Sequence, residues 1–103
     1  MKLFITGIGT DVGKTIASSI IVEALQADYW KPIQAGDLDN SDTNKVEKYV
    51  SNPTTKFHKN AYALNTPASP HLAAEIDGIK IELDNITEPK TTNHLVIEGA
   101  GGI

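Results

Sequence analysis

The glycine-rich segment 7–15, Gly-Ile-Gly-Thr-Asp-Val-Gly-Lys-Thr, holds the clearest set of residues that could do chemistry. It follows the apolar run 3–5 and precedes a stretch of apolar residues at helical spacing. A strand, a glycine loop and a helix that begins at Lys14 are typical of a phosphate-binding P-loop. Glycines let several backbone N–H groups approach a polyphosphate, and the helix adds the positive end of its dipole. We expect Lys14 to reach the outer phosphates and the Thr15 hydroxyl to bind a bridging Mg²⁺.

The spacing of this loop differs from the common P-loop pattern. Five residues separate Gly7 from Gly13, whereas the standard pattern has about four. Ile8 therefore stands where the first glycine belongs. The motif rests on its context, since an apolar strand precedes it and Lys14 and Thr15 close it. The alternative interpretation is a glycine-rich turn that binds nothing.

Three charged residues further along the chain are candidates for the same site. Lys31 follows an apolar strand, and ligands bind where parallel strands end; the alternative is a solvent-exposed lysine after an edge strand. Asp42 stands in the first turn of an expected helix. It could be a magnesium ligand, and the alternative is a carboxylate that only interacts with the helix dipole. Glu98 ends an apolar strand and is followed by glycines, which fits a second magnesium carboxylate or an exposed Glu at a strand-to-turn exit.

Composition limits the class of protein. The chain has 103 residues, enough for one small domain, with a net charge of -4 and no cysteine. The absence of a basic surface disfavours a polynucleotide partner and an anionic membrane surface. Disulfides and thiolate metal sites are excluded. The N-terminus shows neither a signal peptide nor an apolar stretch long enough to span a bilayer, so we expect a cytoplasmic protein.

Hydrophobic periodicity predicts the elements that must position these residues. We expect strands over 2–6, 28–33 and 94–97 and a helix over 14–27, with the first strand, the helix and the second strand forming a right-handed parallel crossover. Near-continuous apolar strands of this kind are covered on both faces. The apolar stripe expected on the helix consists of Ile16, Ala17, Ile20, Ile21, Ala24 and Leu25, while Ser18, Glu23 and Gln26 fall elsewhere.

The central part of the chain contains weaker signals. They predict a helix over 41–50, a short strand over 61–64 and a helix over 70–77, while 79–83 fits either a strand or a helix. Ser41 and Ser69 are the expected N-caps, and Gly78 is expected to end the last of these helices.

Four pieces of the sequence form a specific combination. They are the lengthened loop 7–15, the strand end Lys31-Pro32, the segment 66–71 (Thr-Pro-Ala-Ser-Pro-His) and the segment 98–102 (Glu-Gly-Ala-Gly-Gly). Together they resemble the dethiobiotin synthetase family, over essentially the whole chain. The resemblance implies a P-loop NTPase-like α/β fold with a doubly wound, mostly parallel sheet, incomplete in this chain. It also implies a homodimer that closes a ureido ring on 7,8-diaminononanoate, using carbon dioxide, ATP and Mg²⁺, to make dethiobiotin in biotin biosynthesis.

The resemblance also implies roles for individual residues. The catalytic set is Thr10, Lys14 and Lys31, and the magnesium set is Thr15, Asp42 and Glu98. The nucleotide-binding set is Gly9, Thr10, Asp11, Val12, Gly13, Lys14 and Thr15. The substrate-binding set is Thr10, Lys31, Ala35, Gly99, Ala100 and Gly101.

Two features depart from the family pattern. Ala35 stands where a hydroxyl residue is common, so one substrate hydrogen bond is missing or is supplied by Gln34. The family also continues past the position of Ile103. We therefore expect residues 1–103 to be the amino-terminal part of a P-loop ATP-dependent ligase domain, without ring-closing activity on their own.

Two other classes of ATPase remain alternatives. A cobyrinate-type ATP-dependent amidoligase shares the P-loop and the magnesium carboxylates, although the loop length and the Ser-Pro-His at 69–71 favour the first interpretation. A partitioning-type switch ATPase carries a second lysine early in its P-loop. No lysine lies between Gly7 and Gly13 in this chain.

Overall fold

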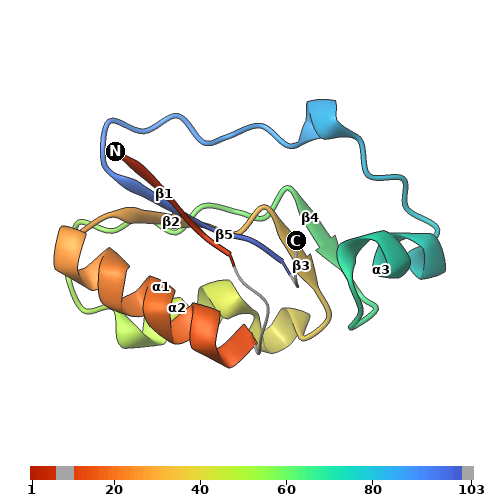
Figure 1. Ribbon diagram of the computed structural model, residues 1–103, viewed down its shortest axis with the longest axis horizontal. Helices are drawn as coiled ribbons and strands as arrows, with labels where there is room; N and C mark the ends of the chain where they lie inside the picture. Colours follow the sequence, from red (N-terminus) through yellow and green to blue (C-terminus); the bar gives the residue numbers. More distant parts are fainter. Residues whose placement is uncertain (7–10, 101–103) are drawn as a thin grey trace.

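The computed structural model describes residues 1–6 and 11–100. Its main sheet has three parallel strands in the order β1-β5-β2, with α1 and α2 packed together on one face (Figure 1). A smaller parallel sheet of β3 and β4 carries α3. The strands are β1 (Lys2–Ile5), β2 (Asp28–Trp30), β3 (Ile33–Ala35), β4 (Tyr62–Leu64) and β5 (Leu95–Glu98), and the helices are α1 (Asp11–Leu25), α2 (Asp42–Tyr49) and α3 (Pro70–Asp77). This architecture confirms the predicted α/β fold with a partial parallel sheet.

Strand β5 lies between the two strands that α1 connects. It pairs in parallel with both, so that Glu98 stands opposite Ile5 and Ile97 stands opposite Trp30. The connection from β1 through α1 to β2 therefore crosses over β5. As a result, the carboxyl ends of all three strands meet at one edge of the sheet.

The prediction of one strand over 28–33 is wrong, because this segment forms two strands that belong to two different sheets. β2 ends at Trp30, and β3 begins at Ile33 and pairs with β4. Pro32 cannot donate a ladder hydrogen bond. Its carbonyl oxygen instead accepts from the backbone N–H groups of Ala61 (2.7 Å) and Tyr62 (3.0 Å). The break leaves Lys31 between the two sheets.

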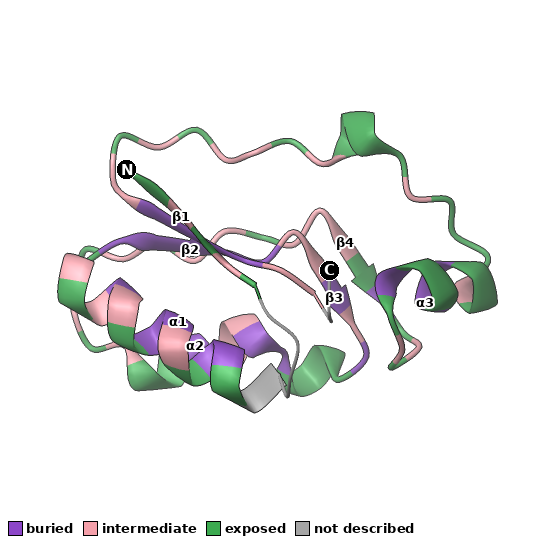
Figure 2. Ribbon diagram, in the orientation of Figure 1, coloured by how far each residue is buried: buried purple, intermediate pink, exposed green. Residues whose placement is uncertain are grey.

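Helix α1 differs from its prediction in start and in orientation. It begins at Asp11, three residues before Lys14. Ile16 and Ile20, which were expected on the buried stripe, are 47% and 65% exposed, whereas Ser18 is fully buried. Figure 2 shows the buried residues of α1 on the side that faces the sheet. That side is partly polar because it borders the carboxyl edge. The predicted apolar stripe is therefore only partly right, because Ile21 and Leu25 pack against the core whereas Ile16 and Ile20 are exposed.

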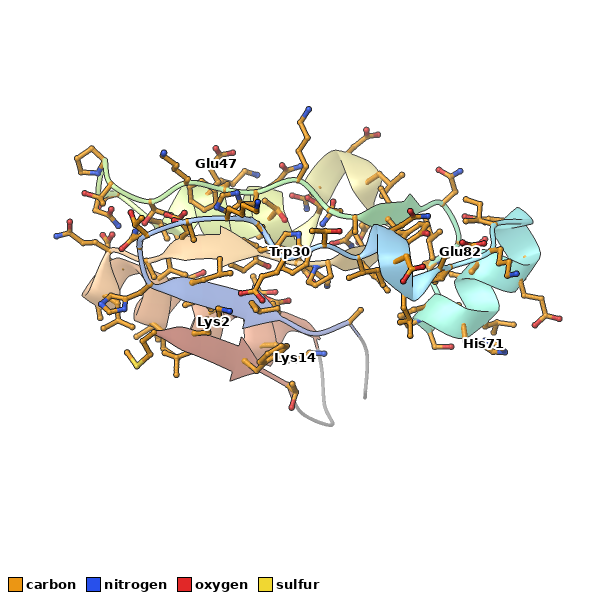
Figure 3. All side chains as sticks on the ribbon, turned by 90° about the horizontal axis from the view of Figure 1, so that it is seen from above. Lys2, Lys14, Trp30, Glu47, His71 and Glu82 are labelled. Atoms are coloured by element: carbon orange, nitrogen blue, oxygen red, sulfur yellow. The ribbon has the colours of Figure 1, made fainter. Side chains whose placement is uncertain are left out.

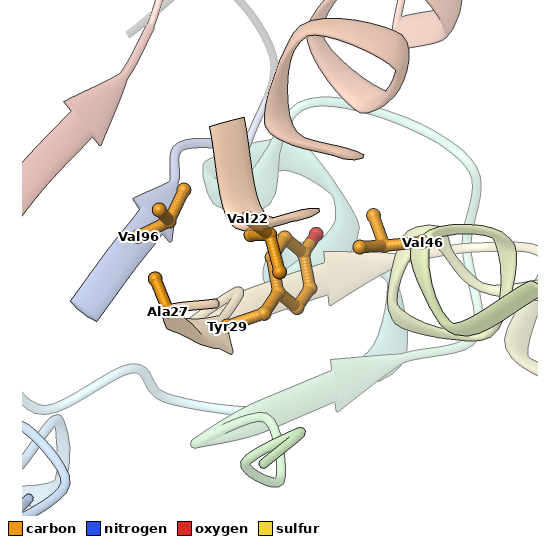
Figure 4. Packing of buried hydrophobic residues seen from close by; sticks show 5 residues of the cluster. All are labelled: Val22, Ala27, Tyr29, Val46 and Val96. Carbon is orange, nitrogen blue, oxygen red and sulfur yellow. The ribbon is translucent and has the colours of Figure 1, made fainter. Parts of the chain in front are cut away.

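The core between the sheet and the two helices is a single cluster that Figure 4 shows in close view. Its fully buried members are Val22, Ala27, Tyr29, Val46 and Val96. Val46 anchors α2 in this core. The Ser41 side chain accepts a hydrogen bond from the backbone N–H of Asn44 (3.2 Å), which confirms Ser41 as the N-cap.

The smaller sheet and α3 follow the predicted pattern. Strand β4 confirms the strand expected over 61–64. Ser69 and Gly78 occupy the N-cap and C-cap positions of α3, although the Ser69 side chain makes no capping hydrogen bond. Gly78 has a φ of 71°, in the left-handed region where glycine commonly ends a helix. The segment 79–83, for which the sequence allowed a strand or a helix, forms neither. It is irregular up to a turn of 3-10 helix at Leu83–Asn85.

The opposite face of the main sheet is covered by irregular chain. Ile86, from the segment that runs back to β5 (Figure 1), packs on Trp30, Leu95 and Ile97. β1 lies at the edge of the sheet, and Phe4 is 69% exposed, so this strand is not covered on both faces in the part described. Within residues 1–6 and 11–100, no helix is long and apolar enough to cross a membrane.

Candidate functional site

Three elements converge at the carboxyl edge of the main sheet. β5 ends at Glu98, β2 ends one residue before Lys31, and the first turns of α1 contain Lys14 and Thr15. The backbone N–H of Gly99 donates to the carbonyl oxygen of Ile5 (2.9 Å), which holds the chain after β5 beside the end of β1. The predicted common edge for the P-loop helix, Lys31 and Glu98 is therefore present.

The side chains of Lys31, Asp42 and Glu98 form a buried group, hereafter the Lys31–Asp42–Glu98 cluster. The Lys31 ammonium donates a hydrogen bond to Oδ2 of Asp42 and lies 3.6 Å from Oε2 of Glu98. The three side chains are 4%, 5% and 0% exposed, respectively. The alternatives of a solvent-exposed Lys31 and an exposed Glu98 are thus wrong. Asp42 is the first residue of α2, so its carboxylate lies both at the helix N-terminus and in the cluster.

Glu98 is held by two residues that the sequence did not single out. Its Oε1 accepts hydrogen bonds from the Ser18 hydroxyl and from the Tyr29 phenol, each at 3.0 Å. Ser18 follows Thr15 by three residues, which places both on one face of α1. Tyr29 precedes Lys31 by two residues, which is the spacing of one strand face. These spacings were the only signals that pointed to either residue.

Gln34 braces the start of α2 against the loop before it. Its Oε1 accepts from the backbone N–H of Asp42 (3.2 Å), and its Nε2 donates to the carbonyl oxygen of Gly36 (3.0 Å). Both ends of this buried amide are therefore engaged within the protein. The neighbouring Ala35 is half-buried at the end of β3, where it pairs with Leu64.

Burial and charge shift the pKa values of these groups in different directions. Burial raises the pKa of Glu98 above its ordinary value, and the nearby Lys31 charge offsets only part of this effect. Burial acts in the same direction on Asp42, but the hydrogen bond and charge of Lys31 outweigh it and lower the pKa of Asp42. Burial and the Glu98 charge raise the pKa of the Tyr29 phenol, so this group remains protonated and donates to Glu98.

Two buried oxygen atoms at this edge fit a bound cation. Oγ1 of Thr15 and Oε2 of Glu98 find no hydrogen-bond partner among the described residues. Leaving buried polar atoms unpaired is costly, and hydroxyl and carboxylate oxygens are the donors that Mg²⁺ prefers. Mg²⁺ is usually bound by one or two carboxylates together with waters and substrate phosphates. Thr15, Asp42 and Glu98 carry oxygen donors of this kind, although among the described residues no group of three or more His, Cys, Asp and Glu side chains is placed so that it could hold a metal ion.

Some of the remaining predicted site residues lie in the described part of the chain and others do not. Lys14 is buried in the first turn of α1 (Figure 3), and the backbones of Asp11, Val12 and Gly13 belong to the same turn. Gly99 and Ala100 are half-buried just beyond β5. The predicted site residues Gly9, Thr10 and Gly101 lie outside the described residues.

Known proteins resemble this chain along nearly its whole length. The ATP-dependent dethiobiotin synthetase BioD of Christiangramia forsetii is 69% identical over 100 residues, which cover 97% of this chain and 48% of that protein. The proteins of the same name from Chlamydia pneumoniae and Cytophaga hutchinsonii are 52% and 50% identical, over 98% and 99% of this chain and 45% and 50% of theirs. These matches confirm the resemblance inferred from the sequence motifs.

The matches cover nearly all of this chain but only part of each relative. The chain spans about half the length of the curated relatives it matches. A family model described as an AAA domain matches residues 1–103. The chain therefore belongs to the AAA domain family.

Proposed function

We propose that this chain is the amino-terminal part of a P-loop ATP-dependent ligase domain that makes dethiobiotin. The reaction closes a ureido ring on 7,8-diaminononanoate with carbon dioxide, ATP and Mg²⁺, as a step of biotin biosynthesis. The observation that carries the proposal is the buried Lys31–Asp42–Glu98 cluster beside the start of α1. The name shared by the relatives supports dethiobiotin as the product and the dependence on ATP.

The proposed chemistry requires concentrated positive charge. One amine of the substrate captures carbon dioxide as a carbamate, and a carbamate oxygen attacks the γ-phosphorus of ATP with release of ADP. The second amine then attacks the carbonyl carbon of the mixed anhydride, so that the ring closes and phosphate leaves. Because two anions must approach each other in the first transfer, groups that offset their repulsion lower the barrier.

Two lysines at the carboxyl edge are suited to this task. We assign Lys14 to the outer phosphates of ATP and Lys31, with Thr10, to the carbamate and the transferred phosphoryl group. Lys31 is 3% exposed, and an ammonium in such a water-poor site acts more strongly on a bound anion than a solvated one does. The loop residues Gly9, Asp11, Val12 and Gly13 complete the phosphate site. Ala35, Gly99, Ala100 and Gly101 complete the diamine site.

The magnesium set in this proposal is Thr15, Asp42 and Glu98. These residues would hold Mg²⁺, which would supply positive charge to offset the negative charge that develops on the phosphate groups during transfer. The two carboxylates come from α2 and β5, and Thr15 comes from α1. Packing of α1 against both α2 and β5 therefore builds the site from three elements.

The assembly and location follow the same resemblance. We propose a cytoplasmic homodimer with active sites at the subunit interface. Its partners are small molecules, and neither a nucleic acid nor a membrane is among them. The net charge of -4 agrees with the absence of a polynucleotide partner.

A direct assay tests the proposed reaction. The full-length protein is incubated with 7,8-diaminononanoate, ATP, Mg²⁺ and ¹³C-labelled bicarbonate, and dethiobiotin is measured by mass spectrometry. We expect labelled dethiobiotin and ADP in equal amounts, and a loss of at least about 100-fold for Lys14→Ala. The control Lys80→Ala removes a lysine whose side chain is 86% exposed and should be as active as the wild type. Absence of label in dethiobiotin, or full activity of Lys14→Ala, contradicts the proposal.

A further inference from the structure

The two oxygens of the Glu98 carboxylate have different surroundings. Oε1 accepts from the hydroxyl groups of Ser18 and Tyr29, each at 3.0 Å. Oε2 is buried, lies 3.6 Å from the Lys31 ammonium and has no hydrogen-bond partner in the described part of the chain. One oxygen is therefore engaged by the protein interior, and the other is left for the site.

The two hydroxyl donors come from elements that are far from Glu98 in the sequence. Ser18 is on α1 and Tyr29 is on β2, 80 and 69 residues from Glu98, respectively. All three side chains are 0% exposed, so no water competes for these hydrogen bonds. A rotation of the carboxylate about its last bond would weaken both bonds at once. The pair therefore fixes the plane of the carboxylate.

We propose that Ser18 and Tyr29 are positioning residues that hold Glu98 so that it presents Oε2 alone to a divalent cation. The inference rests on the magnesium set of the proposed function. Hydrogen bonds to a metal-binding carboxylate orient it, and their loss typically weakens metal binding about 10- to 100-fold. Neither hydroxyl contacts the substrate in this arrangement, and each acts through Glu98.

The first experiment measures cation binding without catalysis. Mn²⁺ replaces Mg²⁺ as a paramagnetic probe, and free Mn²⁺ is followed by electron paramagnetic resonance during titration of the full-length protein. We expect Tyr29→Phe, which keeps the ring, to bind Mn²⁺ about tenfold more weakly than the wild type. Ser18→Ala, which removes the other hydroxyl donor to Oε1, should weaken binding in the same direction. Wild-type affinity in both variants overturns the inference.

The matched control is Tyr62→Phe. The Tyr62 phenol is also hydrogen-bonded, since it accepts from the Glu82 backbone N–H and the Asn85 amide, each at 3.1 Å, but it belongs to the smaller sheet. We expect its Mn²⁺ affinity to equal that of the wild type. Thermal melting of each variant without metal separates a local change in affinity from unfolding. A loss of affinity in Tyr62→Phe as large as in Tyr29→Phe contradicts a specific role for Tyr29.

A double-mutant cycle shows whether Tyr29 acts through Glu98. If it does, Tyr29→Phe produces no further loss of affinity in a Glu98→Gln background. A further tenfold loss in that background would mean that Tyr29 acts on the site by another route, and the inference fails while the magnesium set stands. If Glu98→Gln alone binds Mn²⁺ as the wild type does, Glu98 is not a ligand and the magnesium set itself is wrong.

Discussion

The Lys31 ammonium and the Asp42 carboxylate form an ion pair that is closed to solvent, at the point where β2 gives way to the smaller sheet. The same ammonium lies 3.6 Å from Glu98. In the proposed function, one lysine therefore stands between two carboxylates that are to bind a cation. The Lys31 ammonium and a bound Mg²⁺ would therefore be two positive charges beside the same two carboxylates.

This relationship predicts that Lys31→Met increases affinity for divalent cations. Two unit charges about 4 Å apart interact by about 1 kcal/mol even at the dielectric constant of water. Removing the Lys31 charge should therefore make the free energy of cation binding at these carboxylates more favourable by at least about 1 kcal/mol, or about fivefold in affinity. We expect Mn²⁺ to bind at least that much more tightly to the variant in the absence of substrates. Ring closure should nevertheless be lost, because Lys31 is assigned to the carbamate.

The matched control for this prediction is Lys45→Met. Lys45 lies 3.9 Å from the other oxygen of Asp42, but its side chain is 33% exposed. Solvent screens its charge, so its removal should change Mn²⁺ affinity less than removal of Lys31. Unchanged or weaker Mn²⁺ binding in Lys31→Met would show that the ammonium and the cation use different places.

A second prediction concerns Asp42 and the metal requirement of the reaction. Asp42→Asn keeps the shape of the side chain and removes a charged oxygen ligand, so more Mg²⁺ should be needed for half-maximal activity, by about tenfold or more. The measurement is initial rate against Mg²⁺ concentration at saturating ATP and diamine. An unchanged titration would mean that Asp42 does not bind the metal, and that its role is limited to the N-terminus of α2 and the ion pair with Lys31.

A third prediction uses Asp28, which lies at the start of β2. Its Oδ2 lies 2.9 Å from Nε2 of His58, and its Oδ1 accepts from the Asn93 amide and the Lys56 backbone N–H. Burial alone would raise the pKa of Asp28, but these hydrogen bonds outweigh it and hold the pKa of this carboxyl below its ordinary value. The folded state therefore favours the ionised carboxylate. Its stabilisation is complete above the pKa of the unfolded chain and is lost as the pH falls through the lower, folded pKa.

Asp28→Asn tests this dependence on pH. At about pH 6 the variant should be less stable than the wild type by about 2 kcal/mol, the range expected for hydrogen bonds to a charged group. The difference should shrink below about pH 4 as Asp28 itself becomes protonated. Urea unfolding at a series of pH values provides the measurement. A difference that stays constant down to about pH 3 would contradict the assigned pKa direction.

A fourth prediction compares two glycines with nearly equal backbone angles. Gly36 and Gly78 have φ of 77° and 71°, so alanine is strained at both. A Cβ at Gly36 would lie 2.6 Å from Cβ of Pro67, whereas a Cβ at Gly78 meets no described atom within 4 Å. Gly78→Ala should cost about 1 kcal/mol of unfolding free energy, and Gly36→Ala about 3 kcal/mol. Equal costs in urea unfolding would mean that Pro67 moves aside freely.

The sequence by itself determined the elements whose signals are local. The glycine loop before Lys14 indicated a P-loop, Ser41 and Gly78 marked helix ends, and the glycines after Glu98 marked the end of a strand. Each of these signals depends on residues within a few positions of one another, because caps and turns form local hydrogen bonds. The chemistry of the motifs therefore predicted Lys31, Asp42 and Glu98 as candidates, although it left their alternatives open.

Only the tertiary structure decided how these candidates meet. β5 inserts between β1 and β2, which brings Glu98 within hydrogen-bond distance of Ser18 and Tyr29. The break at Pro32 sends the chain into a second sheet, and α2 then returns Asp42 to Lys31. Apolar periodicity reports which residues avoid water but not which strand a given strand pairs with. The partners of a buried polar group depend on that pairing, and for this reason the sequence named the carboxylates of the site but not the hydroxyl groups that hold one of them.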